Sequence, residues 1–380
     1  MAGALMQIVA YGAQDVYLTS EPTITFWKAV YRRHTNFAME AISQTFSGNI
    51  GYNQTVICRV SRNGDLMGRT WVEVIVNATA DGQSVNRVGF ALLKRVELRI
   101  GGQMIDRHLS TWMYIWTELT HTANQRSLLN SLVGTSDDSG AQNGETIGAG
   151  NTRTFNIPLL FAYCRHPGLA IPLIALQYHE VEIQIEFESL AKSIIVNSTI
   201  TAKLWIDYIF LDTDERKEFA QKPHEYLIET VQSQIVSNSN TSRLTFNHPT
   251  KFIAWVGQHT DAQVDRDIFT DYTNGGAVAL TTSQLKLNGQ DRFAARSNAY
   301  FNQIQPYQHF SGDPAAGINV YSFAVKPEEH QPSGTCNFSR IDNTNLVTTS
   351  SGGINQLSIF AFSYNVFRVA SGMGGLAYSN

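Results

Sequence analysis

Cysteine is scarce in this sequence. The three cysteines, Cys58, Cys164 and Cys336, lie far apart along the 380 residues. They therefore form neither a disulfide framework nor the closely spaced ligand pairs of a structural zinc site. We expect reduced, partly buried thiols in a protein that is assembled in the cytosol.

Positive charge is not in excess either. The sequence has 28 Lys and Arg residues against 32 Asp and Glu residues, which gives a formal net charge of −4. A protein that neutralises many nucleic-acid phosphates needs a basic surface, and its binding then depends strongly on salt. We therefore expect no direct contact with nucleic acid.

Long apolar runs are missing as well. No stretch of about 18 apolar residues could cross a bilayer, and the first ten residues lack the basic start of a secretory signal. The sequence therefore predicts a protein that is made in the cytosol and has no membrane-spanning segment.

Motifs for catalysis and metal binding are also lacking. The sequence contains no HExxH, GxSxG, phosphate-binding loop or paired CxxC. His179, His224 and His330 each stand beside a carboxylate, but neighbours in a strand point to opposite faces. We predict no catalytic residue, no metal ligand and no cofactor. The glycine cluster at 372–375 lacks the strand and helix of a phosphate site and is interpreted as a flexible tail.

What the sequence does contain is a succession of short strand signals, separated by Gly, Asn, Asp and Ser about every ten residues. The clearest lies at residues 181–188, where four apolar residues alternate with four polar ones. Alternation with a period of two is typical of a strand with one buried face. This spacing predicts an all-β protein of the sandwich or barrel type.

Two segments, 202–211 and 357–366, are apolar on both faces, which is typical of a strand between two packed layers. After the first, residues 212–223 are dense in charge, open with acidic residues and end at a proline, which predicts a short helical linker. We therefore predict an N-terminal arm at 1–22, a first sandwich at 23–212, a linker at 213–223, and a second sandwich with a C-terminal tail at 224–380.

A weak internal repeat supports this division. Residues 96–107 and 284–292 each form an alternating strand, a Gly-Gln turn and an Asp-Arg pair, and an aromatic-rich stretch that could be helical follows each copy. The shared order predicts a duplicated sandwich. Between the turn and the closing strand the first half is longer, mainly at 133–152, which we interpret as a surface loop that is either a partner contact or a tolerated insertion.

Long motifs spread over nearly the whole chain carry a resemblance to a known family. They include VAYGAQDVYL at 9–18, ITFWKAVYRRHTNF at 24–37, PLIALQYHE at 172–180, WIDYIFLD at 205–212, LNGQDRF at 287–293, QPSGTCNFSRIDN at 331–343 and SGMGGLAY at 371–378. With these motifs the sequence resembles the major capsid proteins of nucleocytoplasmic large DNA viruses, especially those of chlorella viruses.

The resemblance implies a double jelly roll, that is, two eight-stranded antiparallel β-sandwiches with short helices in the loops. It further implies a homotrimer that forms a pseudo-hexagonal capsomer, neighbouring capsomers and minor capsid proteins as partners, an internal viral membrane at the inner face, and a place in the virion capsid after synthesis and assembly in the host cytoplasm. The alternatives are a jelly-roll protein that binds carbohydrate for host attachment and a minor capsomer paralogue. Residues 261–280 look shorter than the corresponding loop of the chlorella-virus proteins.

The N-terminal segment is the one candidate functional site. Its apolar residues have no obvious partner within a domain, which favours a contact arm over a core element. The alternative is that the segment folds back on its own sandwich, while the resemblance implies an arm on the inner side of a shell. The candidate contact residues are Leu5, Met6, Ile8, Val9, Tyr11, Val16, Tyr17 and Leu18.

Overall fold

The computed structural model describes residues 2–27, 31–134, 146–189, 197–237, 240–258, 269–274, 277–350 and 356–378. The chain divides into two units, Met1–Asn36 and Phe37–Asn380, and each is described by itself. The first unit contains the helices α1 (Ala2–Val9) and α2 (Val16–Thr19). The second unit contains all the sheets described below.

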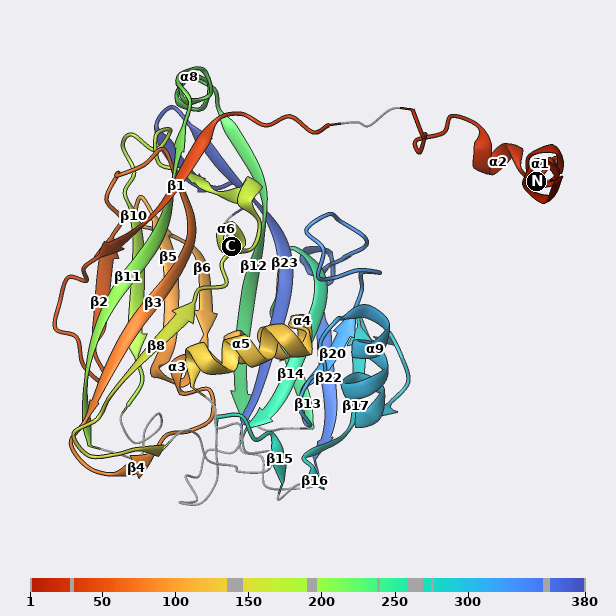
Figure 1. Cartoon of the computed structure of the whole chain (residues 1–380). Helices are drawn as coiled ribbons and strands as arrows, with labels where there is room; N and C mark the ends of the chain where they lie inside the picture. The colour runs from red at the N-terminus through yellow and green to blue at the C-terminus, as the bar shows by residue number, and fades with distance from the viewer. Residues whose placement is uncertain are drawn as a thin grey trace. The chain divides into compact units, whose positions relative to one another are not determined.

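The first sandwich consists of two antiparallel sheets (Figure 1). One sheet has the order β1 (Phe37–Gln44), β11 (Ser198–Leu211), β3 (Leu66–Ala78) and β8 (Thr152–Pro158); the other has the order β2 (Thr55–Arg59), β10 (Val181–Phe187), β5 (Leu93–Ile100) and β6 (Gln103–Leu109). The short β9 (Ile171–Pro172) pairs with β3, and β4 (Gly82–Gln83) pairs with β7 (Thr146–Ile147). In β10 the apolar residues are buried and the polar ones half-buried, so the predicted strand and its alternation are confirmed.

The second sandwich repeats this plan. One sheet has the order β12 (His224–Ser237), β23 (Gln356–Ala370), β14 (Pro249–Gln258) and β20 (Asn319–Ser322); the other has the order β13 (Thr241–Leu244), β22 (Thr344–Ser350), β17 (Leu280–Leu287) and β18 (Gln290–Asp291). Shorter strands extend these sheets or pair with each other: β21 (Cys336–Asn337), β24 (Met373–Leu376), β19 (Arg296–Ser297), β15 (Thr273–Asn274) and β16 (Ala277–Val278).

The two sandwiches therefore have corresponding strands. In each, the first strand pairs with the last long strand, so β1 corresponds to β12, β11 to β23, β3 to β14 and β6 to β18. The repeated Gly-Gln motifs form corresponding hairpin turns, with φ of 58° and 82° at Gly101 and Gly102 and of 49° and 81° at Asn288 and Gly289. Two successive residues with positive φ are typical of tight two-residue hairpins. The predicted duplication is confirmed.

Helices lie in the connections between the strands. They are α3 (Val88–Leu92), α4 (Ser110–Thr120), α5 (Ala123–Val133), α6 (Ala162–Arg165), η1 (Pro167–Leu169), α8 (Thr213–Gln221), η2 (Tyr300–Ile304), α9 (Gln305–His309) and η3 (Phe338–Arg340). Helix α8 begins after Asp212, whose carboxylate accepts a hydrogen bond from the Thr213 N–H, so the helix predicted at the linker is confirmed. The helices expected after both Gly-Gln hairpins are α4 and the pair η2 and α9.

The two segments that are apolar on both faces have different surroundings. In β23 the run from Leu357 to Asn365 is buried on both faces, as predicted. In β11 the inward residues Ile206 and Tyr208 are buried, but Lys203 is exposed and Trp205 is half-buried. The prediction of a doubly covered strand is thus wrong for β11, because no element in the described part of Phe37–Asn380 covers its outward face.

The glycine cluster near the C-terminus is not a flexible tail. Strand β24 pairs antiparallel with β23, with Gly374 opposite Val369. A Cβ on Gly374 would lie 2.5 Å from Cδ2 of Leu176, so the two segments approach closely and a larger residue there would have to displace the Leu176 side chain. These glycines were misassigned as a flexible tail because they pack against residues far away in the sequence, and local composition does not reveal such packing.

The loop predicted at 133–152 lies largely outside the described residues, since 135–145 are not described. Its first residue, Val133, is the buried last residue of α5. Of the segment 261–280, residues 261–268 and 275–276 also lie outside the described part, and its shortening relative to the family stays a prediction. The same holds for the domain boundaries predicted at 22, 212 and 223.

Gly312 offers a test of how tightly the two sandwiches are packed. Its N–H donates to the carbonyl oxygen of Leu119 at 2.8 Å, and an added Cβ would lie 2.2 Å from the carbonyl oxygen of Glu118. Because both neighbours are backbone atoms of α4, we expect Gly312→Ala to lower the free energy of unfolding by about 1–3 kcal/mol. Urea unfolding followed by circular dichroism would measure it.

The matched control is Gly51→Ala. An added Cβ there meets nothing nearer than Cγ of Gln54 at 3.6 Å, and we expect a change within about 0.5 kcal/mol. Equal unfolding curves for the two variants would show that the contact between Gly312 and α4 is loose.

Candidate functional site

Strand β12 lies at an interface between the two sandwiches of the chain. It is an edge strand that pairs with β23 alone among the described strands. Its four central residues, Ile228 to Val231, are nevertheless all buried, whereas its ends alternate. Four consecutive buried residues mean that both faces are covered at this point, and the first sandwich provides the second cover.

Helix α4 supplies the apolar part of this cover. The Trp112 ring centroid lies 6.0 Å from that of Phe252, 5.5 Å from that of Phe360 and 5.7 Å from that of Phe362. Trp116 lies 4.8 Å from Phe362. These phenylalanines point outward from β14 and β23, away from the inner core formed by residues such as Trp255 and Ile359. The tryptophans of the first sandwich thus pack on the outer sheet face of the second.

The edge of β12 is closed by a carboxylate from β6. Oδ1 of Asp106 accepts hydrogen bonds from the Val231 N–H at 3.0 Å and the Arg107 N–H at 2.9 Å. Nε2 of His108 lies 2.9 Å from Oδ2 of the same residue. A free strand edge invites pairing with other chains, and Asp106 closes this one from within the chain.

A buried ionic cluster stands beside this edge. Oε1 of Glu229 lies 2.5 Å from Nζ of the fully buried Lys251, and Oε2 lies 3.1 Å from Nη1 of Arg165. His330 approaches the same carboxylate at 3.8 Å. Burial alone would raise the pKa of Glu229, but Arg165, with His330 and Lys251, lowers it to about 2. Glu229 therefore stays ionised at neutral pH and joins strands of one sandwich to α6 of the other.

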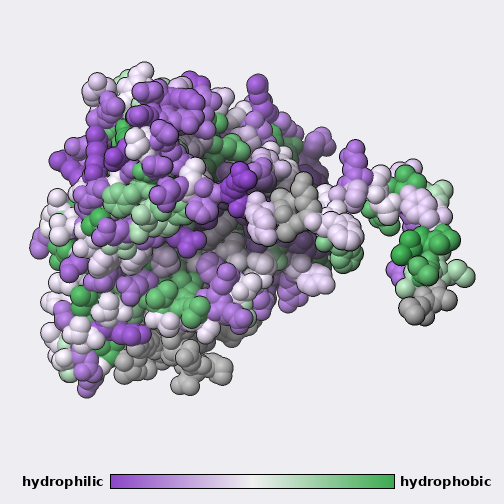
Figure 2. Space-filling view, turned by 45° about the horizontal axis from the view of Figure 1, so that its top comes forward, coloured by the Kyte–Doolittle hydropathy of each residue, from purple (hydrophilic) through white to green (hydrophobic). Residues whose placement is uncertain are grey.

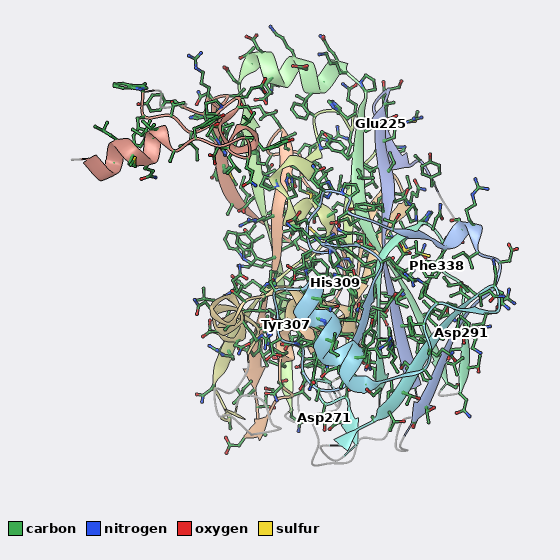
Figure 3. All side chains as sticks on the ribbon, turned by 90° about the vertical axis from the view of Figure 1, so that its right-hand side faces the viewer. Glu225, Asp271, Asp291, Tyr307, His309 and Phe338 are labelled. Carbon is green, nitrogen blue, oxygen red and sulfur yellow. The ribbon has the colours of Figure 1, made fainter. Side chains whose placement is uncertain are left out.

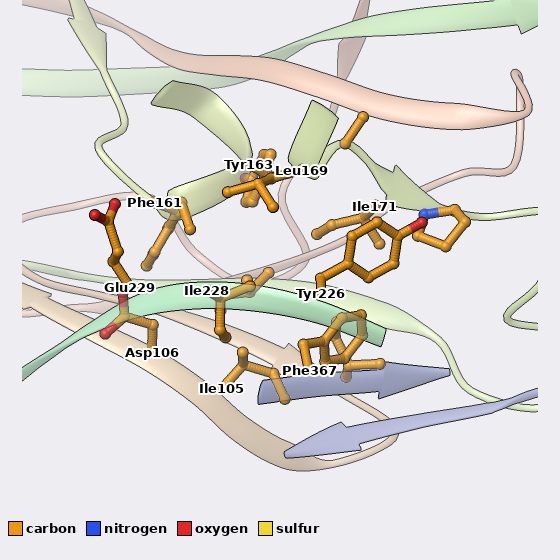
Figure 4. A pocket seen from close by; sticks show the side chains of 15 residues that line it. Ile105, Asp106, Phe161, Tyr163, Leu169, Ile171, Tyr226, Ile228, Glu229 and Phe367 are labelled. Carbon is orange, nitrogen blue, oxygen red and sulfur yellow. The ribbon is translucent and has the colours of Figure 1, made fainter. Parts of the chain in front are cut away.

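Figure 4 shows an apolar cavity next to this cluster. Ile105 of β6, Phe161 and Ile171 line it from the first sandwich, and Tyr226 of β12 and Phe367 of β23 line it from the second. Asp106 and Glu229 also line it, but both carboxylates are engaged by the partners given above. The arrangement is that of a packed joint between the two sandwiches.

Other site types are not found in the described residues. No three His, Cys, Asp or Glu side chains among them are grouped as a metal site would require, and none of their helices is long and apolar enough to cross a membrane. The three cysteines are free, as predicted; burial raises the pKa of Cys58 to about 11 and that of Cys164 to about 12, so their thiols stay protonated at neutral pH.

The predicted arm residues lie in the separate N-terminal unit. Four of them are on α1 and three on α2, and Tyr11 lies between the two helices. All eight are exposed, from 46% at Val16 to 90% at Tyr17, and Figure 2 shows the apolar colouring of this segment. Because these residues are exposed within their unit, the partner contact expected for them stays a prediction.

Sequence reasoning did not identify the residues of the internal joint. Trp112 and Trp116 were visible only as part of an aromatic-rich stretch. Glu229 and Lys251 could have been noticed as charges beside apolar residues in their strands, but Arg165, the second cation that pairs with Glu229, comes from the other half of the chain. Such a pairing over a long sequence distance has no local signal.

The family model described as the major capsid protein N-terminus matches residues 25–212, and the model described as the large eukaryotic DNA virus major capsid protein matches residues 215–375. The chain belongs to this family of major capsid proteins. Its two sandwiches form a double jelly roll, as the resemblance implied, and its function is structural, in the capsid of a virion.

Relatives match along the whole chain. The major capsid protein of Pyramimonas orientalis virus is 46% identical, and that of Paramecium bursaria Chlorella virus 1 is 41% identical, each with 100% of both chains covered. The crystal structure of PBCV-1 VP54 superposes with a TM-score of 0.84 at 38% identity, over 94% of this chain and 100% of that one. The Faustovirus major capsid protein has the same fold, with a TM-score of 0.79, 13% identity, and 97% of this chain and 96% of that chain covered.

The Glu229 cluster predicts how stability of this capsid protein depends on pH. Because the pKa of Glu229 in the fold is about 2, below its ordinary 4.5, its ionised form stabilises the fold above about pH 4.5, and this contribution is lost as the pH falls toward 2. The shift corresponds to about 3 kcal/mol. We expect Glu229→Gln to unfold more easily at pH 7 and to lose less stability than the wild type between pH 5 and pH 2.

Thermal unfolding at a series of pH values would measure this effect. Glu225→Gln is the control, since Glu225 lies on the same strand but is exposed and pairs with the exposed Arg368. If the stability of Glu229→Gln depended on pH in the same way as that of the control, Glu229 would not be ionised in the folded protein.

Proposed function

We propose that three copies of this chain form a capsomer with a pseudo-hexagonal outline, and that these capsomers tile the icosahedral shell of a large double-stranded DNA virus. The observation that supports this proposal is the duplication: two sandwiches of one strand order lie side by side in each chain. Three such chains bring six similar sandwiches into a ring. A tile with six similar sides can cover a flat facet.

Closed trimers impose a particular kind of interface. In a cyclic trimer each copy presents two different surfaces, and each surface meets the other kind on the next copy. Permanent interfaces of this type commonly bury several thousand Å². Contacts between neighbouring capsomers are proposed to be weaker, because a shell of many subunits must allow wrongly placed ones to dissociate.

The N-terminal arm is proposed to contact partners on the inner side of the shell. These are minor capsid proteins and the internal viral membrane. Support comes from the exposure of Leu5, Met6, Ile8 and Val9, which are apolar residues of the short helix α1 in the separate N-terminal unit. Exposed apolar residues that are grouped in this way are typical of interaction sites.

We further propose that the protein has no enzymatic activity, is synthesised and assembled in the host cytoplasm, and does not touch the genome. The near balance of acidic and basic residues gives no support to a nucleic-acid surface. The buried carboxylates Asp106, Glu118 and Glu229 all have partners within the fold, which is the arrangement of structural ion pairs.

The first test of the capsomer is the mass of the purified chain. Size-exclusion chromatography with light scattering should give three times 42.3 kDa, about 127 kDa, with little change on dilution. A mass of one chain at every concentration would contradict the proposal.

The arm has a separate test. Deleting residues 2–20 should leave a trimer of the expected mass, because the sandwiches are complete without them, but should greatly lower the yield of particles in infected cells that supply only the variant. Electron microscopy would count the particles. Replacing Leu5, Met6, Ile8 and Val9 by Ser should reproduce the loss.

The control for the arm is Val325→Ser, which removes an equally exposed apolar residue from the second sandwich. Normal particle yield with the deleted arm would refute the arm's role and leave the trimer proposal standing.

A further inference from the structure

The two sandwiches differ in what covers their outer sheet faces. In the second sandwich, α4 lies on the outer face of β14 and β23, and its tryptophans meet the cross-strand pair of Phe252 and Phe362, whose centroids are 5.2 Å apart. The corresponding strands of the first sandwich are β3 and β11. Among the described residues of Phe37–Asn380 no helix lies on their outer face.

That uncovered face carries its own cross-strand aromatic pair. Trp71 of β3 lies opposite Trp205 of β11, and the two rings stack with centroids 6.1 Å apart and planes at 6°. Nε1 of Trp205 donates to the Glu73 carboxylate at 3.1 Å, which holds the indole in place. The pair thus corresponds to Phe252 and Phe362, but both rings are only half-buried.

The edge strand beside the pair is uncovered too. In β1 the residues from Phe37 to Ala41 are exposed on both faces, and Met39 is 57% exposed. Met39 lies opposite Ile209, on the same outward face as Trp205. The corresponding strand β12 is buried at its centre by the first sandwich. The apolar set Met39, Trp71, Trp205 and Ile209 is called the open face below.

A helix corresponding to α4 exists in the second sandwich. Both α4 and the pair η2 and α9 follow the Gly-Gln hairpin, and they precede β8 and β20, which occupy corresponding places in their sheets. This second helix lies at the surface, where Figure 3 labels Tyr307 and His309. Ile304 is 46% exposed and Tyr307 is 89% exposed. Tyr300 to His309 is called the docking helix below.

We propose that the docking helix of one copy lies on the open face of the next copy, in the way that α4 lies on the second sandwich within each chain. This inference rests on the proposed trimer and names the surfaces that close it. The occupant is a second copy of this chain because the chain already contains the same joint once. Each copy has one open face and one docking helix, so the contact joins unlike surfaces, as a closed ring requires.

Two sets of substitutions test the pairing. The face variant combines Met39→Arg with Trp205→Arg, and the helix variant combines Ile304→Arg with Tyr307→Arg. Each should dissociate to the mass of one chain at concentrations at which the wild type is a trimer, since a buried, unpaired guanidinium opposes the contact. The control Met373→Arg changes a methionine of similar exposure, 51%, on β24 and should stay trimeric.

Mixing the two variants gives the sharper readout. The face variant keeps an intact docking helix and the helix variant an intact open face, so one sound contact can form between them. We expect a one-to-one pair of twice 42.3 kDa, about 85 kDa, which cannot close into a ring. Isotope labelling of one variant and native mass spectrometry would identify the pair.

The outcomes separate this inference from the trimer itself. If the wild type is a trimer and both variants stay trimeric, the surfaces named here are wrong and the trimer stands. If both variants are folded monomers by circular dichroism but do not pair on mixing, the two surfaces do not meet each other, and the inference is again overturned. Should a double variant fail to fold, the single variants Met39→Arg and Tyr307→Arg, both at exposed positions, take its place.

Discussion

The packing of Trp112 and Trp116 against Phe252, Phe360 and Phe362 is the contact on which the rest of the molecule depends. This packing buries the outer face of the sheet that contains β14 and β23, and it thereby fixes the position of the two sandwiches relative to each other. Large aromatic side chains each bury about 150–250 Å², so a few of them provide most of the apolar area of the joint. Asp106 on the strand edge and Gly312 against the end of α4 are placed by this packing.

Compared with apolar side chains of the same volume, the ionic cluster within the joint contributes more to geometry than to total stability. Removing Lys251, Arg165 and Glu229 from water is costly, and buried ion pairs often do no more than balance that cost. Once buried, however, each charged side chain must keep its ion-pair partners, and this restricts how the two sandwiches can be placed against each other. Apolar packing alone would allow the sandwiches to slide by small steps, whereas the hydrogen bonds to Glu229 and from the Val231 N–H exclude such steps.

Sequence patterns predicted the features that depend on local periodicity. The linker helix after Asp212, the duplicated Gly-Gln hairpins and the double burial of β23 follow from residues close together in the chain. The strand at 373–376 was missed because its Gly374 packs against Leu176, about two hundred positions earlier. The outward residues of β11, such as Trp205, have the apolar composition of a strand that is covered on both faces. Whether they are covered depends on which other elements pack against the sheet, and the sequence of one strand does not show this. The contact arm was predicted from apolar residues that have no obvious partner within a domain, and that pattern does not name the partner.

Helix α8, which joins the two sandwiches, has a consequence for how such a protein can change over generations. A tile built from six identical sandwiches would repeat every substitution on all its sides at once. With two sandwiches encoded in one reading frame, a substitution enters one and leaves the other as it was. The two have already diverged: β6 spans Gln103–Leu109, whereas its counterpart β18 is only Gln290–Asp291. In the proposed capsomer, neighbouring sides can therefore acquire different loops and different neighbours while the strand order, and with it the outline, stays the same.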